Sequence, residues 1–379
     1  MLRNDFVRRM ESPGGDKRRS RSLHIDLPLL LILISLCGVG LLVLYSASGQ
    51  NLFYVKRQAL LMLIGFGAMF GVAQFPMRFW ERWSFVFYGI GLMSLLAVLF
   101  FGVGAKGAQR WLDLGFSRFQ PSELMKVAVP MMVSAYLGKR YIPPTFSHVI
   151  MVLIITFIPV LLIVRQPDLG TALLIFASGF FVIFLAGLHK RYLLTSFLLA
   201  LAAIPTLWMF VMRDYQKQRV LTLLSPEDDK LGAGWNIIQS TTAIGSGGWS
   251  GKGWTLGTQS QLNFLPESHT DFIIAVLAEE FGLIGVMTLC ALYALLIGRC
   301  MVIALNSQSQ FSRLIAGSLS LTFFTYVFVN MSMVSGILPV VGVPLPFISY
   351  GGTAIVTLFL GFGILMAIST EPKRIRIDL

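Results

Sequence analysis

The sequence predicts an all-α protein that crosses a membrane ten times, and three observations support this fold class. Of the 379 residues, 55% are hydrophobic and only 13% are charged. Apolar segments of about 20 residues, the length that a spanning helix needs, recur along the whole chain. No stretch of about 100–200 residues remains that would form a separate soluble domain. We therefore expect a polytopic membrane protein with one helical domain, residues 27–370.

Ten apolar segments define the expected helices, and because their number is even, both ends of the chain lie on one side of the membrane. The eighth segment would reach about 50 Å at about 1.5 Å per residue, against a hydrocarbon core about 30 Å thick. We expect its first turns to lie outside the membrane and its helix to break near Gly282 or Gly285. In chain order, the segments lie at 27–47, 58–75, 84–103, 122–138, 148–165, 171–187, 192–212, 271–304, 312–336 and 350–370.

Basic residues orient the helices. Every short loop on the side of the N-terminus carries two Lys or Arg residues, and the positive-inside rule makes that side cytoplasmic. The basic tail 1–26 and the tail 371–379 are then cytoplasmic, whereas residues 213–270 form a large extracytoplasmic loop between the seventh and eighth helices. The formal net charge of +12 suits contact with anionic membrane lipid and does not call for nucleic acid.

The loop between the third and fourth helices carries Lys106, Arg110 and Arg118 on the opposite, outer side. Positive charge there runs against the usual bias, so we expect an anionic partner. Arginine suits phosphate in particular, because its planar guanidinium group presents a fork of N–H donors.

The stretch LPESHTDF, residues 265–272, places three ionisable side chains at the mouth of the eighth helix. Asp271 has two interpretations: it caps the helix and favours the positive end of its dipole, or it accepts a proton where water meets lipid. Glu267 and His269 are weaker candidates, because a lone His beside a helix start is more often structural.

Two further carboxylates stand near apolar helices. Glu123 and Lys126 are spaced i, i+3 at the start of the fourth helix, where charges usually mark a functional interior. A structural ion pair is the alternative, and it is compatible with function. Asp168, in QPDLGT, fits a tight turn, or it orients a base, a cation or a substrate hydroxyl near Asp271, with Arg165 as its partner.

Two stretches rich in Gly or Pro complete the pattern. The Gly-rich stretch 245–253 offers backbone donors for phosphate, but it lacks the G-x-x-x-x-G-K-[ST] pattern, so we expect no nucleotide. The His and acidic residues lack zinc-ligand spacing, whereas a divalent cation held by oxygen atoms stays open. Residues 334–352 predict broken backbone at membrane depth, which is tolerated only beside protein or a water-filled cavity. We expect this segment to line the same cavity as Asp271.

Seven motifs together resemble the SEDS family (shape, elongation, division, sporulation), and in particular its RodA branch. The motifs follow one another in order, within a resemblance that extends from about residue 30 to 370, and GTQSQLNFLPESHTDF favours the RodA branch over its division relative FtsW. The motifs are KGAQRWLDLG, RFQPSELMK, QPDLGT, GWNIIQSTTAIGSGG, GKGWTLGTQSQLNFLPESHTDFI, AVLAEEFGLIG and SGILPVVGVPLPFISYGG.

The resemblance implies a multi-pass protein of the bacterial inner membrane that polymerises lipid II into peptidoglycan during cell elongation, with its active site on the periplasmic side. The family's catalytic aspartate corresponds to Asp271. Its paired Glu and Lys correspond to Glu123 and Lys126, and the aspartate of QPDLGT to Asp168. A class B penicillin-binding protein is implied as the partner that crosslinks the glycan.

For this substrate we expect a single inverting displacement, in which Asp271 acts as general base on the acceptor hydroxyl. Arg110, Lys126 and an optional divalent cation, magnesium or manganese, would stabilise the leaving lipid diphosphate. Two alternatives remain: a lipid II flippase, which needs polar groups accessible from both faces in turn, and a non-enzymatic scaffold, which would leave the charged residues unused. The expected substrate-binding residues are Arg110, Lys126, Glu123, Asp168, His269 and Glu267.

Overall fold

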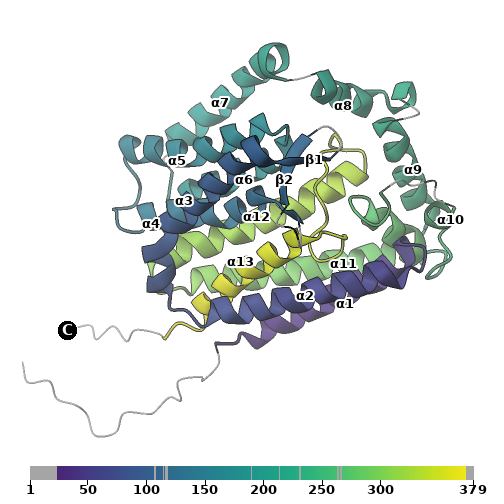
Figure 1. Cartoon of the computed structure of the whole chain (residues 1–379), viewed down its shortest axis with the longest axis horizontal. Coiled ribbons are helices and arrows are strands. Elements are labelled where there is room, and N and C mark those ends of the chain that lie inside the picture. The colour runs from purple at the N-terminus through teal and green to yellow at the C-terminus, as the bar shows by residue number, and fades with distance from the viewer. Residues whose placement is uncertain are drawn as a thin grey trace, which may run out of the picture.

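The structure, a computed structural model, describes residues 24–372 except 106–107, 114, 116–117, 189, 213, 230–231, 263 and 265–266. Each of the ten apolar segments forms a helix (Figure 1), so the expected helical membrane fold is confirmed. Most of the two expected tails lies outside the described residues. The ten helices are α1 (Leu27–Ala47), α2 (Leu52–Ala73), α3 (Met77–Phe101), α4 (Pro121–Leu137), α5 (Phe146–Arg165), α6 (Leu169–Leu185), α7 (Lys190–Thr206), α11 (Ile273–Leu305), α12 (Gln310–Val334) and α13 (Thr353–Ser369).

Shorter elements fill the two outer connections. A small antiparallel sheet with strand order β1-β2-β3, which the sequence did not predict, lies between α3 and α4. The long loop after α7 contains three α-helices and curves around one end of the bundle (Figure 1). These elements are β1 (Val103–Ala105), β2 (Ala108–Asp113), β3 (Arg118–Phe119), the π-helix η1 (Leu207–Val211), α8 (Asp214–Leu224), the 3-10 helix η2 (Pro226–Asp229), α9 (Ala233–Ser246) and α10 (Thr258–Gln261).

The described ends of the chain lie together at the other end of the bundle (Figure 1). His24 Nδ1 and Thr370 Oγ1 are 2.8 Å apart, where α1 begins and α13 ends. Asp26 caps α1 and pairs with Arg299 of α11, with 2.6 Å between Oδ2 and Nη2. Burial raises the pKa of the Asp26 carboxyl, but hydrogen bonds from Arg299 and from the Leu29 N–H outweigh it and hold the pKa below its ordinary value.

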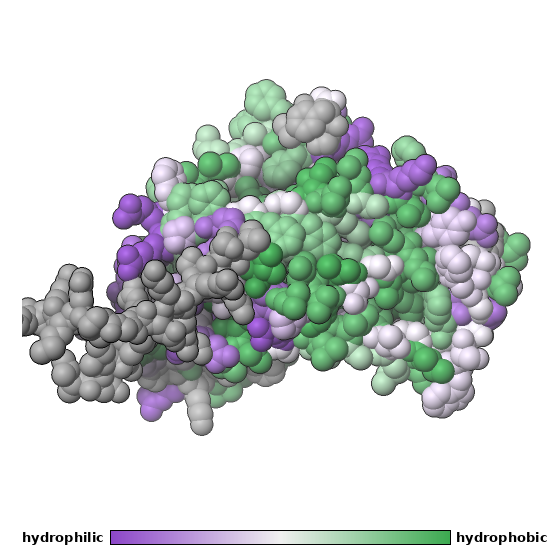
Figure 2. Space-filling model, turned by 90° about the horizontal axis from the view of Figure 1, so that it is seen from below, coloured by the Kyte–Doolittle hydropathy of each residue, from purple (hydrophilic) through white to green (hydrophobic). Residues whose placement is uncertain are grey.

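Helix α4 lies inside the bundle, packed against α3, α5, α6, α12 and α13, and most of its side chains are buried. Among the described helices, α1, α2, α3, α5, α11 and α12 are long and apolar enough to cross a membrane, and α6 and α13 are apolar but shorter. On the face in Figure 2, hydrophobic residues form a broad belt between more polar ends. Because protein surrounds α4, it can carry charged residues that a lipid-facing helix would not tolerate.

Helix α11 is broken at Gly282, one of the two positions that the sequence predicted, with φ 63° and ψ −160°. Only glycine adopts this conformation at little cost. The loop after α9 replaces the lost helical hydrogen bonds: the Leu283 N–H donates to Gly248 O at 2.9 Å, and the Ile284 N–H donates to Trp249 O at 3.2 Å. The break therefore separates a short first segment of α11, which follows the LPESHTDF stretch, from the long segment that spans the bundle.

The Gly-rich stretch 245–253 is bound to α11 through its own backbone donors. The N–H of Lys252 donates to Glu279 O and that of Gly253 to Glu280 O, both at 3.0 Å. A Cβ at position 282 would lie 2.6 Å from Trp249 O, so the two backbones also touch. Helix carbonyls thus occupy two of the donors that the sequence suggested for phosphate, and this stretch stabilises the helix break instead.

The side chain of Glu279 strengthens this connection. It has no exposed surface, and its Oε1 lies 2.7 Å from Lys252 Nζ. The Thr258 hydroxyl and the Gln259 N–H both donate to the same Oε1 at 3.0 Å. One buried carboxylate therefore holds residues 247–261 against the first segment of α11.

Glu279→Gln should loosen this loop, because an uncharged amide cannot replace the ion pair with Lys252. We expect the amide protons of residues 247–261 to exchange at least about tenfold faster, which corresponds to about 1.4 kcal/mol of lost local stability. Hydrogen–deuterium exchange followed by mass spectrometry measures this directly.

The matched control is Asp26→Asn, which removes an ion pair of similar length and burial at the opposite end. Asparagine still caps a helix well, so the fold should persist. Exchange in 247–261 should stay unchanged in this variant. An equal rise in both variants, or no rise in Glu279→Gln, would show that Glu279 does not hold the loop.

Candidate functional site

Asp271 lies in the turn that precedes α11. The turn begins at Glu267, which has φ 58°, and the Thr270 hydroxyl donates to Glu267 Oε2 at 2.8 Å. The Ser268 hydroxyl donates to Ala47 O at 3.0 Å, which fixes the turn to the last residue of α1. Helix α1 has 21 residues, about 30 Å at about 1.5 Å per residue, so Asp271 lies at the end of the bundle opposite the described termini.

The Asp271 side chain is partly exposed and faces the segment between α12 and α13. A Cβ on Gly342 would lie 3.5 Å from Asp271 Oδ2, so the carboxylate is next to this backbone. Asn330 of α12 connects the turn that contains Asp271 to the segment after α12, because its Nδ2 donates to Asp271 O at 2.9 Å and to Val343 O at 2.7 Å. The structure thus places Gly342 and Val343 of the segment 334–352 near Asp271, and a cavity shared by this segment and Asp271 stays a prediction.

The other two candidates of the LPESHTDF stretch have structural contacts. The His269 ring lies among aromatic rings, with centroids 5.2 Å from Tyr54 and 6.3 Å from Tyr350, and its backbone oxygen accepts from the Tyr350 N–H at 2.9 Å. The Glu267 carboxylate closes the turn through Thr270. These contacts stabilise the turn. A direct role of the His269 and Glu267 side chains in substrate binding stays a prediction.

Asp168 both caps α6 and forms an ion pair. Its Oδ1 accepts from the Thr171 N–H at 3.3 Å, and Arg110 Nη1 lies 3.9 Å from the same oxygen. The Gln120 amide, at the start of α4, donates to Oδ2 at 3.2 Å. The ion-pair partner is therefore Arg110 and not Arg165, because the small sheet brings Arg110 back over the QPDLGT turn, which the sequence did not predict.

Arg110 uses much of its guanidinium group on this turn. It donates from Nε to Gln166 O at 3.4 Å and from Nη2 to Pro167 O. Its side chain is 31% exposed and lines a pocket with Asp168, the α8 residue Arg219 and residues 339–341. Residues 339–341 of this pocket directly precede Gly342, which lies next to Asp271. The Arg110–Asp168 pair and Asp271 are therefore both close to the segment that connects α12 and α13.

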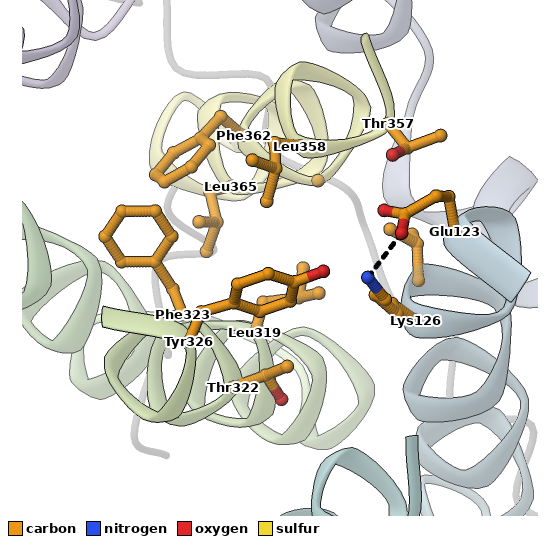
Figure 3. Close-up of a pocket in the computed structure, with 12 residues that line it drawn as sticks. Glu123, Lys126, Leu319, Thr322, Phe323, Tyr326, Thr357, Leu358, Phe362 and Leu365 are labelled. Carbon is orange, nitrogen blue, oxygen red and sulfur yellow. Dashed lines mark hydrogen bonds and ion pairs between the residues drawn. The ribbon is translucent and has the colours of Figure 1, made fainter. Parts of the chain in front are cut away.

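Glu123 and Lys126 form a buried ion pair on α4, with 2.6 Å between Lys126 Nζ and Glu123 Oε1 and only 8% of either side chain exposed. Lys126 Nζ also lies 4.5 Å from the centre of the Tyr326 ring. Figure 3 shows the pair at one side of a pocket whose opposite side is apolar. The apolar residues of this pocket include Leu319, Phe323, Leu358, Phe362 and Leu365.

Two helices connect these groups. Tyr326 and Asn330 are four residues apart on α12, about one turn, so one face of α12 contacts both Lys126 and the backbone of Asp271. On α4, Gln120 contacts Asp168 and lies about one turn before Glu123. The predicted charged residues are thus brought to one end of the bundle, around α4, α12 and the segment 339–343.

The donor set does not fit a metal centre built by the protein alone. Within the described residues, no group of three or more His, Cys, Asp or Glu side chains converges. Asp168 is engaged by Arg110 and by Gln120.

Sequence reasoning missed several residues of the site, above all Asn330, Tyr326 and Gln120. An uncharged amide in a predicted membrane helix is itself a signal, because polar groups there are costly and usually have a partner. Asn330 has no exposed surface, which fits that expectation. The contacts of Tyr326 and Gln120 gave no signal in the sequence, because they depend on how distant helices pack.

Comparison with known proteins supports the resemblance seen in the sequence. A family model described as "Cell cycle protein" (FTSW_RODA_SPOVE) matches residues 27–374. The chain is 53% identical over 351 residues to the peptidoglycan glycosyltransferase MrdB of Escherichia coli K12, covering 93% of this chain and 95% of that protein. It is 36% identical over 362 residues to a probable peptidoglycan glycosyltransferase FtsW of Geobacter sulfurreducens, covering 92% and 96%.

Solved structures agree with these sequence matches. The fold matches a chain of a peptidoglycan synthase complex with a TM-score of 0.80 and 30% identity, covering 91% of this chain and 97% of that one. It matches the rod shape determining protein RodA of Thermus thermophilus with a TM-score of 0.69 and 28% identity, covering 91% and 96%. The chain therefore belongs to the FtsW, RodA and SpoVE family of cell cycle proteins.

Proposed function

We propose that this protein is a peptidoglycan glycosyltransferase that polymerises lipid II into glycan strands during cell elongation. The observation that carries the proposal is the position of Asp271, which is partly exposed at the same end of the membrane bundle as two pairs of opposite charge. Relatives named peptidoglycan glycosyltransferases cover nearly the whole chain and support the same activity.

Asp271 acts as the general base in this proposal. The acceptor sugar attacks the anomeric carbon of the donor through its 4-hydroxyl group, which loses its proton to the Asp271 carboxylate as the new bond forms. An α-linked donor that becomes a β-1,4 linkage requires inversion in one displacement, so no covalent enzyme intermediate is needed. The bond to the lipid diphosphate breaks, and its electron pair leaves with the diphosphate.

Lys126 and Arg110 stabilise the charge that develops on the leaving diphosphate. Lys126 is well placed, because its ammonium group has three donors and Glu123 takes one of them. Arg110 has five N–H donors, and it uses two of them on carbonyl oxygens of the QPDLGT turn. We propose that any divalent cation, magnesium or manganese, arrives with the diphosphate oxygens and not in a protein cage.

The apolar side of the pocket beside Lys126 suits the first isoprene units of the lipid carrier. Leu319, Phe323 and Phe362 line it, and the ion pair stands at its edge (Figure 3). A diphosphate near Lys126 would then continue into hydrocarbon without leaving the protein. This arrangement separates a polar reacting end from an apolar tail, as lipid II requires.

The protein lies in the inner membrane as a multi-pass protein, as its apolar helices and its RodA-like fold support. We propose that both termini are cytoplasmic and that the end with Asp271 faces the periplasm. A solved relative belongs to a peptidoglycan synthase complex. By analogy, we propose a class B penicillin-binding protein as the partner of this chain.

A lipid II flippase is the main rival, and the position of the charges argues against it. A flippase must offer polar groups to both faces in turn, whereas Asp271, Arg110–Asp168 and Glu123–Lys126 gather toward one end. A non-enzymatic scaffold would need none of these residues.

Asp271→Asn should leave the protein folded and inserted but lower the rate of polymer formation by at least about 10²-fold, the usual contribution of a general base. Purified protein with labelled lipid II, read as glycan length on a gel, measures this rate. Asp113→Asn is the control, because Asp113 is an exposed carboxylate at the end of β2. The proposed role of Asp271 is wrong if the Asp271→Asn protein polymerises lipid II as fast as the control.

Gly361→Leu should weaken substrate binding by filling the pocket beside Lys126. Gly361 lines this pocket, and a Cβ at position 361 would lie 3.8 Å from Val127 and 3.9 Å from Leu319, so the first carbon of the new side chain fits without a clash. We expect KM for lipid II to rise about tenfold, or about 1.4 kcal/mol, with a smaller change in kcat.

Gly71→Leu provides the control for this variant. Gly71 is exposed on α2, and a Cβ there would meet no atom within 4 Å. Steady-state kinetics on both variants should separate the pocket from a general effect of leucine on the bundle. An unchanged KM for lipid II in folded Gly361→Leu protein would show that the lipid tail of the substrate does not bind in this pocket.

A further inference from the structure

We propose that Asn330 is the positioning residue of Asp271, an inference that rests on the function proposed above. Asn330 lies in α12 with no exposed surface. An amide inside a membrane helix is costly unless it is hydrogen-bonded, so its contacts explain why it is there. These contacts are the backbone oxygens of Asp271 and Val343, at 2.9 Å and 2.7 Å from Nδ2.

The orientation of the amide follows from its partners. Two carbonyl oxygens accept, so both must face the NH₂ group and not the amide oxygen. The amide oxygen of Asn330 is buried without a hydrogen-bond partner among the described residues. The side chain therefore acts through its NH₂ group, which joins the backbone of Asp271 to the backbone of Val343.

These two bonds set the place of the reacting carboxylate. Val343 follows Gly342, whose backbone lies beside Asp271 Oδ2. Asn330 thus fixes the Asp271 backbone and the surface against which its side chain rests. Without the two donors, the turn and the segment 339–343 would separate, and the carboxylate would lose its alignment with the acceptor hydroxyl.

The same helix face also sets the distance to the leaving group. Tyr326, about one turn before Asn330, lies over Lys126. Helix α12 therefore fixes the general base through Asn330 and contacts the proposed diphosphate-binding cation through Tyr326. A base displaced by about 1 Å is expected to cost about 10²-fold in rate.

Asn330→Leu tests the inference, because leucine has a similar size and no donor. We expect kcat for lipid II polymerisation to fall about 10²-fold, while KM changes less than about threefold, since Asn330 contacts protein backbone and not substrate. Asn330→Asp is a second variant of nearly identical shape, in which the two N–H donors are replaced by at most one O–H donor, when the carboxyl group is protonated. It should show the same pattern, and it carries the test if the leucine variant does not fold.

Gln58→Leu is the matched control for a purely structural role. Gln58 is equally buried, its Nε2 donates to Ser349 O at 2.9 Å in the same connecting segment, and its amide oxygen likewise has no partner among the described residues. It makes no contact with the Asp271 backbone oxygen. We expect Gln58→Leu to lower the thermal stability as much as Asn330→Leu, yet to keep kcat within about threefold.

Three outcomes would overturn the inference. An equal fall in kcat for Gln58→Leu would show that any loss of support for the segment slows the reaction. A rise in KM with unchanged kcat in the Asn330 variants would indicate that Asn330 contacts the substrate directly. Normal kinetics in both Asn330 variants would show that its donors are not needed. Asp271→Asn is assayed in parallel: if it polymerises normally, the proposed function itself fails, whereas an inactive Asp271→Asn beside active Asn330 variants refutes only the positioning role.

Discussion

The high energy of an isolated charge in hydrocarbon governs this structure. Two buried carboxylates are paired with a lysine at close range, in Glu123–Lys126 at 2.6 Å and in Glu279–Lys252 at 2.7 Å. The first pair is placed on α4, the helix that other helices surround. The charged side chains of the site therefore lie in the interior and at one end of the bundle, while lipid-facing surfaces stay apolar.

The break at Gly282 gives that arrangement its geometry. It divides α11, so that the short segment after Asp271 is held by a loop and not by the spanning helix alone. Glycine-rich backbone can approach a helix this closely because it has no side chains in the way. The turn before α11 is fixed by α1 through Ser268 and by α12 through Asn330, whereas Glu279 binds the loop to the first segment of α11.

The sequence predicted the spans and the charged candidates because both stand out in single segments. Apolar length gave the ten helices, and Gly282 followed from a segment too long to span. Glu123, Lys126 and Asp271 were conspicuous as charges beside apolar helices. The errors arose where the partner is distant in sequence: Asp168 pairs with Arg110 across 58 residues, and the donors of 245–253 bind α11. Neither contact leaves a periodic or local signal.

The two ion pairs also bear on how an anionic substrate is received. With Glu123 beside Lys126 and Asp168 beside Arg110, each pair is close to neutral before the diphosphate arrives. A bare cation held there would be costly in a membrane, whereas a paired cation is not. In the proposed mechanism, Lys126 would bind phosphate through the donors that Glu123 leaves over, while the carboxylate keeps the ammonium group in place. The carboxylates of these pairs would then hold cations ready where the leaving group develops its charge, with Asp271 as the proposed base at the same end of the bundle.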